Sequence, residues 1–402
     1  MLDLRKAAIA TSLLSTALLS PISVMAVVPD YSSNITPLVN YLKANQAADG
    51  SITGFGGETA WTVIGLVANG IDPHTVQNSG VSVVDFLQNN APGTVTGWER
   101  DLLAVTAAGE NPFTFGGHNY VSQIESSVSA GQIGSATGIN DDTFGILALI
   151  STGPSANQQI IFESVDFVIA NQNSDGGWSY AVGNPSDPDS TAIAVQALQS
   201  VQSKGFSNSG LNSAVNDGVD YLTNSQQVAG GWDAGFGTNA GSTAWSVLAI
   251  LGDDSAVTNG LNFIIGKQDV SGGIDGGFGA DTYTSANSLI AFGQKAFPVG
   301  EFDGTFEQPI PEPQPQPEPN QNDTEGRVLA ANTTNSDQGK VLAATLPNTG
   351  IDATIPLAVI QSFPKPVSKD GVNKSFILSL AALDLGLALW ILSGRVKKNI
   401  VN

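Results

Sequence analysis

The apolar residues between positions 34 and 297 recur in a constant register before four glutamines, Gln46, Gln172, Gln226 and Gln268. Apolar side chains stand four, seven and eleven positions before each glutamine, and an aromatic side chain stands five positions before it. Steps of three and four residues place side chains on one stripe of an α-helix. Each of these segments is therefore predicted to form an amphipathic helix that ends close to its glutamine.

A glycine-rich turn follows each glutamine, and a second segment that is apolar on nearly all sides comes after the turn, as in residues 191–198 and 243–251. Because a helix that is apolar all round is buried, each unit is predicted to pair an outer helix with a buried inner helix. The interval between Gln46 and Gln172 leaves room for two degenerate units, near 77–110 and 118–153. The pattern predicts an all-α array of six helical hairpins that bury their faces against their neighbours.

Two of the turns, at residues 172–178 and 226–232, carry a glutamine, a glycine and a tryptophan at fixed spacing, and residues 268–274 keep the first two. This motif resembles the Q-x3-G-x-W repeat of squalene cyclases. Over residues 34–297 the chain resembles the family of terpenoid cyclases and protein prenyltransferases. The resemblance implies a closed (α/α)6 toroid, with an open solenoid as the alternative. The repeat residues are predicted to be scaffold: glutamine bonds backbone groups at the end of the outer helix, glycine turns the chain, and tryptophan covers the joint.

Residues 1–26 have the features of a secretory signal peptide. Arg5 and Lys6 precede an apolar core over residues 7–19, and Val24 and Ala26 are the small residues that a signal peptidase reads. The alternative is a short N-terminal membrane anchor, for which the apolar core is short. The sequence therefore predicts export of the toroid domain, assigned to residues 27–300.

The C-terminal third has the features of a surface anchor. A proline-rich linker over residues 301–345 is predicted to be disordered, with extended polyproline II structure favoured over residues 309–320. Residues 346–375 hold an LPxTG-like sorting motif, formed by Leu346, Pro347, Thr349 and Gly350, and a spacer. Residues 376–402 form an apolar segment with a basic tail, which predicts a transmembrane helix with its end in the cytoplasm. The predicted partners are the membrane and a sortase that cleaves the motif; an uncut membrane anchor is the alternative.

Composition excludes several kinds of chemistry. The chain has no cysteine, so disulfides, a catalytic thiol and the cysteine-containing zinc site of protein prenyltransferases are excluded. The net charge of −21 argues against nucleic acid and anionic membranes as partners, because both are bound through lysine and arginine. No cofactor and no metal site are predicted.

One segment resembles a catalytic motif. Asp187-Pro188-Asp189-Ser190-Thr191 is similar to the D-x-D-D-T-A motif that holds the proton donor of squalene–hopene cyclases. The resemblance makes Asp189 the general acid and Asp187 its partner, but Ser190 replaces the third aspartate. Other repeats also have a threonine just before the inner helix, so the sequence favours helix N-capping for this segment.

Three functions remain open. The favoured function is an extracellular binding or interaction module for an unknown ligand, held at the inner-helix mouth by Trp61, Trp98, Trp245, Asp141 and Asp142. The first alternative is a terpene cyclase that uses Asp189; the presence of one toroid and an aromatic content of 7% count against it. The second alternative is a glycan-active (α/α)6 enzyme with converging carboxylates at Asp141, Asp142, Asp187 and Asp189.

Overall fold

The computed structural model describes residues 31–153 and 158–302, which belong to one compact unit. The predicted signal peptide, the sorting motif, the apolar C-terminal segment and all but the first two residues of the linker lie outside the described residues. Within residues 31–153 and 158–302, none of the helices has both the length and the apolar character that a membrane crossing requires.

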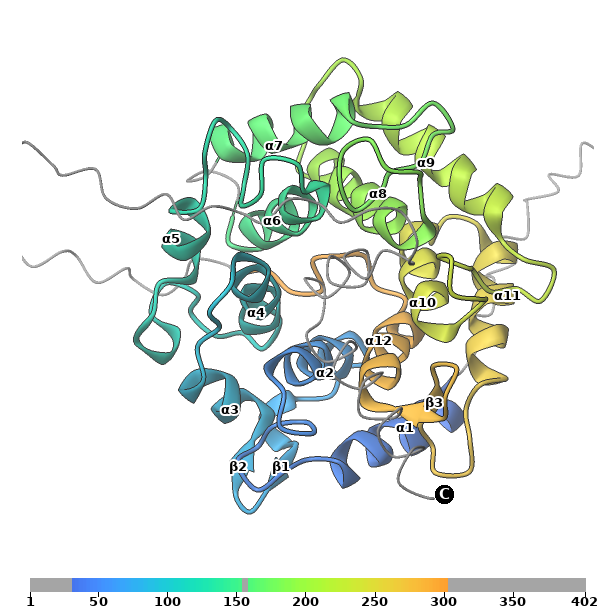
Figure 1. Cartoon of the computed structure of the whole chain (residues 1–402). Coiled ribbons are helices and arrows are strands. Elements are labelled where there is room, and N and C mark those ends of the chain that lie inside the picture. Colours follow the sequence, from blue (N-terminus) through green and yellow to red (C-terminus); the bar gives the residue numbers. More distant parts are fainter. Residues whose placement is uncertain (1–30, 154–157, 303–402) are drawn as a thin grey trace, which may run out of the picture. The chain divides into compact units, whose positions relative to one another are not determined.

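Twelve α-helices of the described chain alternate between two concentric layers (Figure 1). The outer helices are α1 (Ser32–Ala44), α3 (Val83–Asn89), α5 (Tyr120–Glu125), α7 (Gln158–Ala170), α9 (Leu211–Ser225) and α11 (Asp254–Ile265). The inner helices are α2 (Gly56–Ala68), α4 (Val95–Ala107), α6 (Ile139–Ser151), α8 (Pro188–Ser203), α10 (Ala240–Ala249) and α12 (Thr282–Gly293). Each inner helix packs on the next, and α12 packs on α2, which closes the ring. The predicted array of six hairpins is confirmed, and the ring is closed as in an α/α toroid.

Short elements join the helices at the turns. Two 3₁₀ turns, η1 (Pro73–Thr75) and η2 (Phe115–Gly117), lie in the first half of the ring. Strand β1 (Gln77–Asn78) pairs antiparallel with β2 (Val81–Ser82), and β3 (Ile274–Asp275) pairs antiparallel with β4 (Ala280–Asp281). The two degenerate units lie where the sequence predicts them, and their outer helices α3 and α5 are the shortest of the described helices, with 7 and 6 residues.

The repeat glutamines tie neighbouring hairpins together. Each side-chain amide donates one hydrogen bond to the glycine carbonyl of its own turn and a second to a carbonyl of the next repeat. For Gln46 the second acceptor is the Val76 carbonyl, before β1; for the other three it lies within the first four residues of the next outer helix. For Gln226 the acceptors are Gly230 at 2.8 Å and Ala256 at 2.9 Å. The predicted bond to the outer helix that ends at the glutamine is thus wrong, because the amide reaches forward into the following repeat.

The turn glycines and the tryptophans have the predicted scaffold roles. Gly176 and Gly230 have φ of +86° and +93°, and a Cβ at either position would collide with a backbone carbonyl of the next outer helix. Trp178 and Trp232 are fully buried at the hairpin joint. Their indole N–H groups donate to carbonyls of their own outer helices, over 2.7 and 2.8 Å. The motif therefore fixes the joint within each hairpin and the spacing between hairpins.

The ring closes through the same glutamine contact. Gln268 donates to the backbone carbonyl of Asn34 on α1 at 2.9 Å, and the Asn34 amide donates back to the Gln268 side chain at 2.8 Å. Both residues belong to segments 234 positions apart. The glutamine of the last repeat thus binds the first outer helix in the same way as Gln172 and Gln226 bind the outer helix of the repeat that follows each of them.

Replacing Gln268 with alanine should loosen the closure more than the rest of the ring. The change removes the Asn34 and Gly272 bonds and is expected to cost about 1–3 kcal/mol locally. Amide hydrogen exchange should accelerate in α1, whereas Gln226→Ala should accelerate exchange in α11 and leave α1 unchanged. Equal exchange of α1 in the parent and in Gln268→Ala would contradict this role.

Residues 294–302 cover the end of the ring at which the inner helices finish. The Phe302 amide donates to the Ser151 carbonyl of α6 at 2.7 Å, and Lys204, the C-cap residue of α8, forms an ion pair with Glu301. The buried Phe297 ring lies 5.7 Å from the ring of Trp245. This segment forms a floor, so the described ring is a cup whose mouth lies at the inner-helix N-termini.

Candidate functional site

The interior of the ring, called the lumen here, contains a cluster of aromatic side chains. Trp61, Phe144 and Trp245 are each the sixth residue of their inner helices, α2, α6 and α10. Their ring centroids are separated by 5.2–6.0 Å, although these three helices are not neighbours in the ring. The contacts therefore cross the centre of the ring. The predicted binding tryptophans Trp61 and Trp245 do meet, but they are buried against each other and fill the middle of the lumen.

In the inner helices, the side chain of the fourth residue points outward, away from the lumen. Thr59, Thr191 and Thr243 occupy this position, and their hydroxyls accept backbone N–H groups at the hairpin joint over 2.9–3.1 Å. They are not N-caps, as the sequence had suggested, because they lie inside the helices. The side chains that cap α8, α10 and α12 are Asp187, Asn239 and Asp281.

Asp189 lies on the lumen side of α8. It is the second residue of this helix, one turn before Ile193, which occupies the sixth position shared with the aromatic cluster. Its Oδ1 atom is buried and has no hydrogen-bond partner within the described residues. Burial raises the pKa of Asp189 to about 7, the nearby Asp187 charge raises it too, and the Ser242 hydroxyl opposes them. Asp189 is thus a carboxyl group that is partly protonated at neutral pH.

Asp187 has a different role from Asp189. Its carboxylate accepts the Ser190 N–H and the Ser190 hydroxyl, each at 2.8 Å, and so caps α8. Burial raises the pKa of Asp187, and the Ser190 bonds oppose that rise. Ser190, which departs from the catalytic motif, therefore binds the capping aspartate. The motif divides into a cap, Asp187, and a carboxyl group that faces the lumen, Asp189.

Polar groups without partners gather deeper in the lumen. Asn287 is the sixth residue of α12, and both polar atoms of its buried amide lack a hydrogen-bond partner within the described residues. Gln196 of α8 donates to the Ala192 carbonyl at 3.1 Å, while its Oε1 has no partner there. Sequence analysis missed both residues, because they stand in helices that read as uniformly buried. Unsatisfied buried amides are costly in a purely structural core.

Glu99 is a second buried carboxyl group that sequence analysis missed. It is the fifth residue of α4, where four other inner helices have alanine, at positions 60, 192, 244 and 286. The side chain is fully buried, and neither oxygen has a hydrogen-bond partner in the described chain. Burial, with smaller contributions from Asp141 and Asp142, raises the pKa of Glu99 well above its usual value. No sequence signal marked it, because this unit lacks the glutamine that sets the register.

The two aspartates of α6 form hydrogen bonds with the loop before α6 and with the outer helix that follows it. Asp142 accepts the Ile133 N–H at 3.1 Å and the Ser164 hydroxyl of outer helix α7 at 2.7 Å, so its bonded oxygen faces outward. Burial raises the pKa of Asp142 to about 6. Asp141 accepts the Ser135 N–H at 2.8 Å. Together with the capping role of Asp187, these bonds engage three of the four predicted carboxylates separately and leave Asp189 with an unbonded oxygen toward the lumen, which argues against a converging glycosidase-type pair.

Trp98 lies away from the other two predicted binding tryptophans. It is the fourth residue of α4, on the outward face, and its ring packs on Tyr120 and His118 at centroid distances of 4.9 and 5.7 Å. Its expected place beside Trp61 and Trp245 is wrong. The reason is the register: Trp98 stands four residues after the capping Thr94, whereas Trp61 stands six residues after the N-cap of α2.

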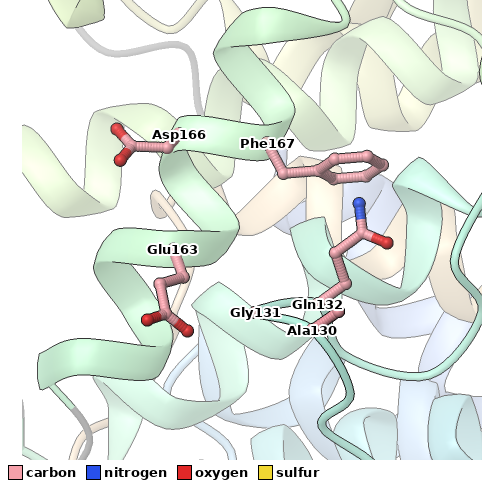
Figure 2. A pocket seen from close by; sticks show the side chains of 6 residues that line it. All are labelled: Ala130, Gly131, Gln132, Glu163, Asp166 and Phe167. Atoms are coloured by element: carbon pink, nitrogen blue, oxygen red, sulfur yellow. The ribbon is translucent and has the colours of Figure 1, made fainter.

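A surface hollow of about 410 Å³ lies outside the ring. Figure 2 shows that Glu163, Asp166 and Phe167 line it from α7, and that Ala130, Gly131 and Gln132 line it from the loop before α6. It does not include the lumen residues or Asp189. In residues 31–153 and 158–302, no three acidic or histidine side chains come together as metal ligands would.

Comparison with known families matches one segment of the chain. Residues 137–243 match the family described as the squalene-hopene cyclase C-terminal domain. This segment runs from the loop before α6 into α10 and contains Asp187 and Asp189. The match supports the resemblance to terpenoid cyclases over these residues. No curated protein is significantly similar to this chain in sequence.

Solved structures support the fold. A crystal structure of a protein from Actinoplanes superposes with a TM-score of 0.50 at 14% identity, over 66% of this chain and 99% of that chain. The type II terpene cyclase MstE from Scytonema gives 0.48 at 10% identity, over 66% and 98% of the two chains. An ent-copalyl diphosphate synthase from Streptomyces platensis gives 0.44 at 15% identity, over 60% of this chain and half of its own length. At these identities the likeness concerns the fold alone.

Proposed function

We propose that the toroid is a terpenoid cyclase-like domain that receives a polyprenyl chain at its mouth and protonates it with Asp189. The observation that carries the proposal is the buried, unbonded Asp189 oxygen on the lumen side of α8, with a pKa of about 7. A general acid needs a pKa close to the working pH, and a carboxyl group reaches that range only when burial destabilises its charge. The squalene-hopene cyclase match over this segment supports the same chemistry.

The proposed reaction is a proton-initiated isomerisation. The Asp189 O–H gives its proton to the terminal alkene, whose electron pair forms the new C–H bond and leaves a tertiary cation. Each following alkene donates its electron pair to the cation and closes a ring. The last cation loses a proton to water, and solvent reprotonates Asp189. Below Asp189, Trp61, Phe144 and Trp245 supply aromatic rings that stabilise cationic charge once the entering chain has parted the cluster in which they pack on one another.

Replacing Asp189 with asparagine is expected to lower cyclisation of squalene at least about 100-fold, the usual contribution of a general acid. In the parent protein, the rate should fall as pH rises through about 7, because deprotonation removes the donor. Product formation is measured by gas chromatography across this pH range. Asp281→Asn is the control: like Asp187, the neighbour of Asp189, Asp281 caps an inner helix, and asparagine caps equally well, as Asn239 does on α10. It should retain activity.

A second candidate is binding without turnover, in the manner of an interaction module. Two observations favour it: Ser190 stands in place of the third motif aspartate, and the aromatic cluster already fills the centre of the lumen. The same samples separate the two functions. Quenching of tryptophan fluorescence by squalene, with no product and no change in Asp189→Asn, would contradict catalysis and support binding.

We further propose that the domain works outside the cell, anchored through its C-terminus. The support is the sequence alone: the signal-like residues 1–26, the sorting motif around Leu346–Gly350 and the apolar segment with its basic tail. An exported domain would meet isoprenoids dissolved in the membrane rather than soluble diphosphates. Protease added to intact cells would digest the toroid if this topology is correct.

A further inference from the structure

Large apolar side chains are exposed at the tips of four loops on the rim of the cup. Phe55, Phe236 and Phe278 are 50%, 75% and 82% exposed, and Val182 is 42% exposed. Each stands in the loop that leads into an inner helix: α2, α10, α12 and α8, respectively. These helices are consecutive in the ring. Because the inner helices all start at the mouth, the four residues, here called the apolar crown, occupy one continuous arc of the rim.

The loops hold these phenylalanines in place by a repeated construction. Phe236 lies between Gly235 and Gly237, with φ of +97° and +89°, and Phe278 lies between two glycines with φ of +120° and +107°. The Asp233 carboxylate accepts both glycine N–H groups of the first loop, at 2.7 and 2.9 Å. Asp275 does the same in the second, at 2.7 and 2.8 Å. Two loops from different repeats thus present a phenylalanine to solvent by the same bonds.

At these exposed fractions, the crown side chains gain less from folding than a core side chain does. Burying a phenylalanine is worth about 1.5–3 kcal/mol, and the crown residues forgo much of that gain. Glycines with positive φ are also entropically costly to order. Because two loops of the rim hold an exposed phenylalanine by the same bonds, the rim is suited to contact a partner without first having to be ordered.

Negative charge surrounds the crown. Asp233, in the loop of Phe236, and Asp269, in the turn after Gln268, are exposed, and the Asp275 carboxylate accepts the N–H groups of the two glycines that flank Phe278. The Gly277 and Gly279 N–H groups lower the pKa of Asp275, so this charge persists in mild acid. Lys267, which lies over the Phe263 ring, is the cation nearest to these residues in the chain. The rim combines apolar anchors with an acidic surround.

We infer that the apolar crown docks a basic polypeptide segment that carries apolar side chains. Charge complementarity selects this partner, because the acidic surround attracts lysine and arginine while the phenylalanines receive apolar groups. The chain's own residues 303–345 carry seven acidic and two basic side chains, so their charge does not complement that of the rim. Nor does that of a second copy of this chain, with a net charge of −21.

The test uses the full-length chain and a synthetic amphipathic peptide of lysine and leucine, with binding followed by isothermal titration. The expected result is specific binding that weakens severalfold at high salt. The triple variant Phe55→Ser, Phe236→Ser and Phe278→Ser should lose at least about tenfold in affinity, as loss of several anchors does. It should fold normally, since all three rings are exposed and serine is a good N-cap at position 55, the N-cap of α2.

A matched control is the pair Val228→Ser and Val270→Ser, which removes two fully exposed valines from the neighbouring glutamine turns. This pair should leave affinity unchanged. The inference is overturned if the triple variant binds within threefold of the parent, or if the valine pair loses as much affinity as the triple variant. Equal binding of a glutamate–leucine peptide, or of phosphatidylcholine vesicles, also overturns it, because neither contact depends on the acidic surround.

Discussion

Replacing Trp232 with alanine is expected to lower the free energy of unfolding by about 3–5 kcal/mol, the usual cost of a large cavity in a core. The Trp232 side chain is fully buried, and its indole N–H donates to the Leu222 carbonyl at 2.8 Å. A Cβ added to Gly260 of α11 would lie 3.1 Å from the indole, so the ring also holds the next outer helix in place. Urea denaturation measures the change.

Two further variants make this prediction specific. Trp232→Phe keeps an aromatic ring but loses the hydrogen bond, so it should cost less than Trp232→Ala. Phe236→Ala removes an aromatic side chain from the same repeat, but that side chain is 75% exposed and should cost little. A loss below about 1 kcal/mol for Trp232→Ala would show that the motif tryptophan does not anchor the joint.

Replacing Glu99 with glutamine is expected to stabilise the protein at pH 7, because the folded parent loses about 1.4 kcal/mol for each pH unit between the ordinary pKa of this group and its raised value, up to pH 7. The carboxyl group is fully buried and has no hydrogen-bond partner among the described residues. At neutral pH the folded protein must either bury this charge or take up a proton that the unfolded chain does not hold. Glutamine keeps the shape and removes the ionisation.

The raised pKa of Glu99 also predicts how the stability of the parent protein changes with pH. The pKa of Glu99 is raised in the folded protein above the ordinary value of 4.5, so the folded state binds more protons between 4.5 and the raised pKa. Stability of the parent should therefore fall as pH rises above about 4.5, and the curves of parent and Glu99→Gln should converge below it. Asp189, with a pKa raised from 3.8 to about 7, acts in the same direction between those values.

Asp220→Asn is the control for Glu99→Gln, because Asp220 is exposed on outer helix α9. Because this side chain is exposed, the change should alter the free energy of unfolding by no more than about 0.5 kcal/mol. A Glu99→Gln protein that is less stable than the parent at pH 7, with the same slope against pH, would show that the carboxylate is stabilised by contacts that the described residues do not contain.

The resemblance to terpenoid cyclases and the structure both single out Asp189, but on different grounds. The resemblance selects Asp189 through the spacing of Asp187 and Thr191, and the structure separates the roles of these neighbours. Asp187 caps the helix, Thr191 faces the hairpin joint, and Asp189 faces the lumen. The burial and orientation of this single carboxyl group, rather than a complete motif, make Asp189 suited to donate a proton.

The sequence by itself determined the helices and their layers. Each repeat carries its own periodic stripe, its glutamine and its turn glycines, so the hairpins follow from interactions within about 50 residues of chain, as in other repeat folds. The burial of Trp178 and Trp232 was predictable for the same reason. The unit that contains Trp98 and Glu99 lacks the glutamine, so the sequence did not show which positions of its inner helix face the lumen. The prediction that Trp98 lies beside Trp61 and Trp245 was therefore wrong.

Only the tertiary structure decided what meets inside the ring. Trp61, Phe144 and Trp245 come from helices that are not adjacent, and the bond from Gln268 to Asn34 joins residues 234 positions apart. Closure of the ring sets these contacts, because it depends on the summed rotation of all six hairpins. The same holds for Glu99 and Asp189: a carboxyl group has the same local sequence whether it faces water or a lumen, and its pKa follows from the neighbours that the closed ring supplies.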